Sequence, residues 1–100
     1  MELRLGTLAD MPADGSAKEF NCDGKWVCVA RVDGQLSAMD NVCPHRGGPL
    51  GTGVVMDGKV VCPWHGWQFD PQTGECAQVD ASVPVYKLRV DGEEVFVEVG

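Results

Sequence analysis

The chain has 100 residues, a formal charge of -7 and an isoelectric point near 4.5. This length suits one domain with a modest core and leaves no room for a second catalytic domain. An acidic surface repels nucleic acid and anionic membranes, so we expect neither as a partner, and we expect protein partners with a basic docking face. No apolar run approaches the roughly 18 residues of a membrane span, and the N-terminus resembles no secretion signal, which predicts a soluble, cytoplasmic protein.

Asp-Gly pairs mark the expected hairpins along the chain. They occur at positions 23–24, 33–34, 57–58 and 91–92, each between runs rich in valine and other apolar residues. An Asp-Gly pair in such a setting is the strongest short-range signal for a β-hairpin. The chain therefore reads as a series of short antiparallel strands.

Two runs show the two-residue period of a strand with one face turned to a core. In residues 25–32 the expected core face carries Trp26, Cys28, Ala30 and Val32. In residues 94–99 three valines share one face. No long segment shows a helical stripe, so the expected fold class is all-β, with a small antiparallel sandwich or barrel.

The amino-acid composition of the chain changes between residues 40 and 76. This segment holds four of the six prolines, seven glycines and both histidines. Proline and glycine at this density indicate loops, which is where functional groups are displayed. We expect a single domain over 1–100, with a base formed by 1–39 and 77–100 and an inserted metal-binding subdomain at about 40–76.

Two short blocks in this segment carry metal-ligating residues. The first contains Cys43 and His45, and after sixteen intervening residues the second contains Cys62 and His65. Each block supplies one thiolate and one imidazole, the partition needed by a 2Fe-2S cluster with two sulfur ligands on one iron and two nitrogen ligands on the other. A structural zinc site in an interaction module is the alternative, but zinc sites usually pair their cysteines as C-x₂₋₄-C, whereas both blocks here are mixed.

The blocks CPHRGGPL and CPWHGWQFD resemble the ligand motif of Rieske proteins, C-x-H followed by C-x-x-H. The motif covers about a quarter of the chain, and the hairpin-rich flanks are similar to the rest of a Rieske domain. The resemblance implies one Rieske-type 2Fe-2S cluster per chain. It implies that Cys43 and Cys62 bind the inner iron, and that His45 and His65 bind the outer iron through their δ nitrogens.

Residues beside the ligands are candidates for the surroundings of the cluster. These candidates are Arg46, Gly47, Gly48, Trp64, Gly66, Trp67 and Phe69. The glycines either let backbone N–H groups approach the cluster or simply form turns, and Trp67 is expected to pack into the subdomain core.

The resemblance also predicts a low midpoint potential. High-potential Rieske proteins place hydroxyl donors where this chain has Trp67 and Phe69, and a disulfide where it has Gly48 and Trp64. Fewer hydrogen bonds stabilise the reduced state less, which favours the lower part of the roughly -150 to +300 mV Rieske range.

The histidine count restricts the function. A mononuclear oxygenase iron needs two further histidines, but both histidines of this chain are already assigned. We therefore expect an electron-transfer component that is not itself an enzyme. The resemblance implies either a ferredoxin between a flavin-dependent NAD(P)H reductase and a terminal oxygenase, or the small subunit of an assimilatory nitrite reductase bound to its large subunit.

Three cysteines lie outside the motif. Cys28 alternates with Trp26 and Ala30 and is expected to be a small core residue. Cys22 and Cys76 have no assignable partner, and an inert thiol is the expectation for both.

Overall fold

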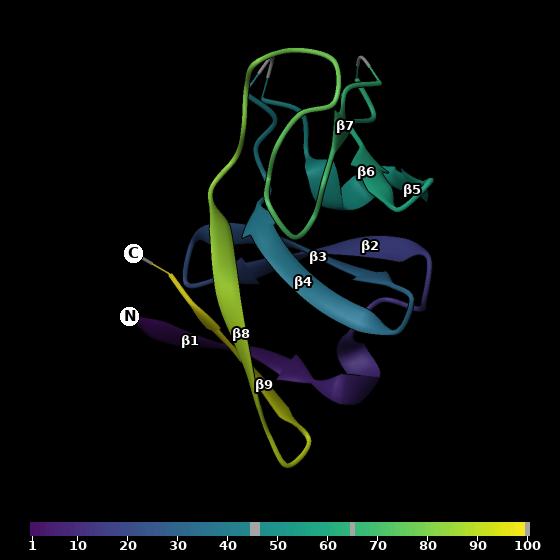
Figure 1. Ribbon diagram of the computed structural model, residues 1–100. Coiled ribbons are helices and arrows are strands. Elements are labelled where there is room, and N and C mark those ends of the chain that lie inside the picture. The colour runs from purple at the N-terminus through teal and green to yellow at the C-terminus, as the bar shows by residue number, and fades with distance from the viewer. Residues whose placement is uncertain (45–46, 65, 100) are drawn as a thin grey trace.

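A computed structural model describes residues 1–44, 47–64 and 66–99. Its described part is built of short strands and two single-turn 3-10 helices, which confirms the all-β prediction (Figure 1). In chain order the elements are β1 (Glu2–Thr7), η1 (Leu8–Asp10), β2 (Ser16–Cys22), β3 (Lys25–Val32), β4 (Gln35–Asp40), η2 (Leu50–Thr52), β5 (Val54–Met56), β6 (Lys59–Val61), β7 (Gln68–Phe69), β8 (Val85–Asp91) and β9 (Glu94–Glu98). No helix in the described residues is long and apolar enough to cross a bilayer.

The Asp-Gly pairs form the expected hairpins. At 23–24, 33–34 and 57–58 both residues have positive φ, as a two-residue type I′ turn requires. The hairpin near position 91 also forms, but its turn lies one residue later than predicted. Asp91 pairs with Glu94 inside the ladder, and the turn residues are Gly92, with φ of 63°, and Glu93.

The strands form two antiparallel sheets. The larger has the order β1-β9-β8-β4-β3-β2, and its edge strands β1 and β2 contact each other, so the sheet curls on itself. The smaller sheet, β5-β6-β7, lies at one end of the molecule, and the segment between β7 and β8 loops over that end (Figure 1). The subdomain boundaries at 39/40 and 76/77 stay a prediction.

Strand β3 separates two cores, which corrects the expectation of a single buried face. Cys28 and Ala30 face a core shared with the small sheet, as predicted. Val27 and Val29 on the opposite face are also fully buried, in a core that includes the β9 valines. Trp26 lies on the predicted face but is 43% exposed, because it sits near the end of the strand.

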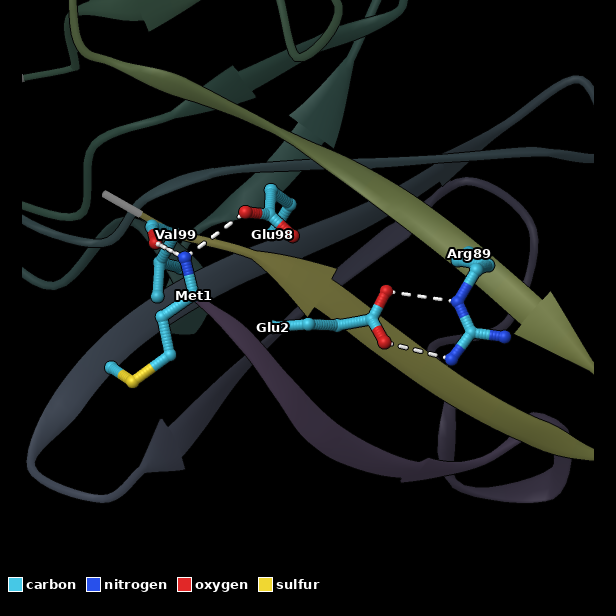
Figure 2. Close-up of polar contacts among 5 residues, drawn as sticks. All are labelled: Met1, Glu2, Arg89, Glu98 and Val99. Atoms are coloured by element: carbon cyan, nitrogen blue, oxygen red, sulfur yellow. Dashed lines mark hydrogen bonds and ion pairs between the residues drawn. The ribbon is translucent and has the colours of Figure 1, made fainter.

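Polar side chains connect β1, β8 and β9 at the surface (Figure 2). Arg89 donates two hydrogen bonds to the Glu2 carboxylate, at 2.8 Å from Nε and 2.7 Å from Nη2, and these bonds hold the pKa of Glu2 below its usual value. The Met1 ammonium donates to Glu98 at 3.0 Å and to the Val99 carbonyl at 2.8 Å. The two ion pairs are exposed to solvent, so we expect them to contribute little to stability.

Candidate metal centre

Cys43 begins a tight hairpin loop. Its N–H donates to the carbonyl of Gly48 at 2.9 Å, and the N–H of Gly47 donates back to the carbonyl of Cys43 at 2.7 Å. A bridge between Val42 and Pro49 closes the loop. The backbone hydrogen bonds of Cys43 therefore close the loop and hold this residue at its start.

Cys62 begins a second loop with the same hydrogen-bond pattern. Its N–H donates to the carbonyl of Trp67 at 2.7 Å, and the N–H of Gly66 donates to the carbonyl of Cys62 at 3.0 Å. The pairing of Val61 with Gln68 closes this loop between β6 and β7. The two cysteines thus occupy equivalent positions in two loops of one kind.

The sequence pattern x-Pro-x-x-Gly accounts for this loop. Proline fixes φ at the position after the cysteine, and glycine supplies the positive φ that closes the turn, 75° at both Gly47 and Gly66. A third copy starts at Asp70, where Gly74 has φ of 78° and its N–H donates to the Asp70 carbonyl at 2.7 Å. The recurrence of the pattern is a signal that the ligand spacing alone did not bring out.

The thiols of Cys43 and Cys62 lie in one apolar environment. The two residues are 1% and 2% exposed, and both belong to the core shared by the small sheet and β3. Gly48 allows the loops to approach closely, because a Cβ at this position would lie 2.9 Å from Cys62 Sγ. Thiolates in a dry pocket are the ligands that iron–sulfur clusters use, so these residues fit the sulfur half of such a site.

Trp64 lies against the same glycine but faces outward. The Cβ position of Gly48 is 3.1 Å from the Trp64 ring, and Trp64 is 56% exposed. Gly48 and Trp64 are the two positions at which the resemblance places a disulfide in high-potential Rieske proteins. In this chain the two positions are in contact without a disulfide. The indole occupies the space between the loops and also forms part of the surface.

Trp67 and Phe69 extend the packing below the loops. Phe69 is fully buried in the shared core, and Trp67 is partly buried against it, as predicted. Neither side chain carries a hydroxyl. At the two positions where the resemblance places hydroxyl donors, this chain therefore has an indole (Trp67) and a phenyl ring (Phe69).

Three predicted site residues lie outside the described residues. They are His45, Arg46 and His65, and their assigned roles stay predictions. Of the glycines, Gly47 and Gly66 act as turn formers, whereas Gly48 serves the close approach of the two loops.

The remaining cysteines differ in burial. Cys28 is fully buried, as predicted, and burial raises its pKa to about 12, with a further contribution from the Glu19 carboxylate. Cys22 is buried in the second core. Cys76 is partly exposed, and its thiol donates to the side-chain carbonyl of Gln78 at 3.6 Å.

Comparison with known proteins identifies the class. Residues 2–89 match the Rieske 2Fe-2S domain family. The chain is 36% identical to the ferredoxin subunit of anthranilate 1,2-dioxygenase from Burkholderia cepacia, covering 94% of this chain and 96% of the relative. It is 31% identical to human apoptosis-inducing factor 3 over 84% of this chain, but it spans only 14% of the length of that protein.

Two solved structures have the same architecture. The ferredoxin of carbazole 1,9a-dioxygenase from Nocardioides aromaticivorans superposes with a TM-score of 0.85 at 31% identity, covering 97% of this chain and 96% of the other. A structure described as an NADH-dependent nitrite reductase small subunit from Mycobacterium tuberculosis gives a TM-score of 0.86 at 26% identity, covering 100% and 96%. The chain belongs to the Rieske 2Fe-2S domain family. Membership of this family confirms the predicted Rieske fold and the predicted Rieske-type 2Fe-2S cofactor.

Proposed function

We propose that this chain is a one-electron carrier without a substrate site of its own. Its cluster would be held by the thiolates of Cys43 and Cys62 and the imidazoles of His45 and His65. When bound, a Rieske cluster takes up and releases one electron. The observation that carries this proposal is the burial of both cysteines at equivalent positions of two matching loops that approach each other at Gly48.

The circuit we favour runs from a flavin-dependent NAD(P)H reductase to a terminal oxygenase, in the cytoplasm. Its support is the likeness along nearly the whole length to the ferredoxin subunit of a dioxygenase. The likeness to a nitrite reductase small subunit supports the second candidate, a subunit bound to a large reductase. A shuttle should elute alone in gel filtration and accept electrons from a separate reductase, whereas a subunit should co-purify with its large partner.

The expected midpoint potential is low. Trp67 and Phe69 offer no hydroxyl to the cluster sulfurs, so less hydrogen bonding would stabilise the extra charge of the reduced state. We expect a value toward the bottom of the roughly -150 to +300 mV Rieske range. A redox titration followed by visible absorption checks this, and a midpoint well above about +100 mV would contradict it.

EPR spectroscopy of the dithionite-reduced protein tests the site. Mixed nitrogen and sulfur ligation gives a signal distinct from that of an all-cysteine cluster, and a zinc site gives none. His65→Ala and Cys62→Ser should each abolish the native signal, whereas the matched control Cys76→Ser should keep it. A native spectrum in either ligand variant would show that the ligand assignment is wrong.

A further inference from the structure

A groove of about 220 Å³ lies beside the loop that begins at Cys43. This loop and the one that begins at Cys62 are called the first and second cluster loops, after the cluster they are proposed to hold. Val42, Gly47 and Pro49 line the groove from the first cluster loop and its flanks, and Trp26 and Glu19 line it from β3 and β2. Gly47 belongs to the loop that begins at Cys43. The groove is therefore lined in part by the loop that begins at one of the proposed ligands.

The Glu19 carboxylate is held in place at this groove. Asn41, a buried polar residue that is 4% exposed, donates from its amide nitrogen to Glu19 at 2.9 Å. The amide oxygen of Asn41 accepts from the N–H of Gly51 at 2.7 Å, which fixes the orientation of Asn41. In the described part of the chain, the ion pairs do not include Glu19.

Trp26 supplies an aromatic surface next to this charge. It is 43% exposed although its strand is otherwise largely buried. Among the described residues, cations lie over Phe20, Tyr86 and Phe96, but none lies over Trp26. An exposed indole beside a carboxylate is a suitable environment for a cation with an apolar stem, because the ring attracts the charge and the stem packs on the apolar wall.

The charge of the whole molecule favours the same occupant. At -7 the chain attracts basic proteins over a distance, and close contacts then fix the orientation of the complex. A basic residue at the rim of a partner's docking face would meet the groove when that face covers the first cluster loop.

We propose that this groove receives a cationic side chain, lysine or arginine, of the redox partner protein. Its charged head would pair with Glu19 and lie against the indole of Trp26. The docking surface then extends from the cluster loops onto β2 and β3. This inference rests on the electron-carrier function proposed above and assigns a recognition role to two residues outside the cluster motif.

Electron transfer to cytochrome c, a basic haem protein, provides the test. The reduced holoprotein is mixed with oxidised cytochrome c in a stopped-flow instrument at low and high ionic strength. We expect Glu19→Gln and Trp26→Ala each to lower the second-order rate constant by about threefold at low ionic strength. The effect of Glu19→Gln should shrink as salt screens the charge.

Matched controls separate the groove from general effects. Glu93→Gln makes the same charge change at the β8–β9 turn, and Val90→Ala removes an exposed apolar side chain from β8; both should leave the rate close to that of the parent protein. Gln at position 19 can still accept from Asn41, so this variant should keep its fold, its EPR signal and its midpoint potential.

Two results would overturn the inference. The first is an equal loss of rate in Glu19→Gln and Glu93→Gln, which would mean that only net charge matters. The second is a rate change fully explained by a shifted potential. A parent protein without a Rieske EPR signal would instead contradict the proposed function, so the two failures are distinguishable.

Discussion

Cys28 and Cys76 show how the fold gives two thiols of one chain different chemistry. Cys28 is fully buried between β2 and β4, and its pKa is raised to about 12 because burial disfavours the thiolate. Cys76 lies partly exposed beside Gln78. The thiolate is the reactive form of cysteine. Cys28 is therefore protected twice, because reagents cannot reach it and because its raised pKa keeps the thiol protonated.

We therefore expect iodoacetamide at pH 8 to modify Cys76 in the native holoprotein and to leave Cys28 unmodified. Peptide mapping by mass spectrometry after timed quenching measures both sites. The same reaction in urea is the control, because unfolding should expose Cys28 and restore an ordinary pKa. Modification of Cys28 as fast as that of Cys76 in the native protein would contradict its burial.

Gly48 is the residue on which the approach of the two cluster loops depends. A methyl group there would lie 2.9 Å from Cys62 Sγ and 3.1 Å from the Trp64 ring, closer than ordinary van der Waals contact. We predict that Gly48→Ala displaces the second loop and lowers the iron content per chain, with an altered EPR signal. Iron analysis and EPR check this, and an unchanged cluster would show that the loops tolerate a wider separation.

At the level of elements, one loop type is used three times, beginning at Cys43, Cys62 and Asp70. Each copy reverses the chain between paired residues, and each ends with a glycine of positive φ. Two copies carry a cysteine at the first position, and the third carries an aspartate whose side chain accepts from the N–H of Gln72 at 2.9 Å. The loop is thus a recurring structural unit, and two of its three copies place a thiol at the first position.

The glycines of these loops are not equivalent in their surroundings. At Gly66 a Cβ would meet no atom of the described residues within 4 Å, so Gly66→Ala should cost mainly the strain of positive φ, about 1 kcal/mol. At Gly74 the Cβ would also overlap the carbonyl oxygen of Val83, so Gly74→Ala should cost at least about 1 kcal/mol more. Urea unfolding of the two holoprotein variants measures the difference, and equal losses would show that the segment around Val83 shifts freely.

For the whole molecule, the core beneath the cluster loops is shared by both sheets. Cys28 and Met39 of the large sheet belong to the same hydrophobic core as Cys43, Cys62 and Phe69. The backbone of η2 also crosses β2 closely, since a Cβ at Gly51 would lie 2.6 Å from the Glu19 Cα. The loops and the large sheet should therefore unfold together.

We predict that removal of the cluster lowers the thermal stability of the entire chain. A bound cluster stabilises only the folded state, and the core it adjoins reaches into the large sheet. Far-UV circular dichroism and tryptophan fluorescence of cluster-free and cluster-loaded protein provide the measurement, and both signals should shift to lower temperature together. An unchanged midpoint in the cluster-free protein would contradict this coupling.

Local features of this protein are predictable from its sequence. The Asp-Gly hairpins, the two cysteine blocks and the buried valines of β9 depend on φ preferences and side-chain periods that neighbouring residues set. The turn near position 91 lies one residue later than the Asp-Gly pair predicts, because Asp91 pairs with Glu94 in the ladder and leaves Gly92 and Glu93 as the turn residues. The family and its cofactor follow from the ligand blocks for the same local reason.

Other features depend on contacts between distant segments, and only the tertiary structure decides them. The burial of both faces of β3 requires one core on each side of the large sheet. The approach of Gly48 to Cys62 and the groove between Trp26 and the first cluster loop join residues far apart in the chain. The sequence by itself determined the family and its cofactor and predicts which residues bind the cluster, because ligand chemistry belongs to the residue. The tertiary structure decided which surfaces surround that site, because packing belongs to the whole chain.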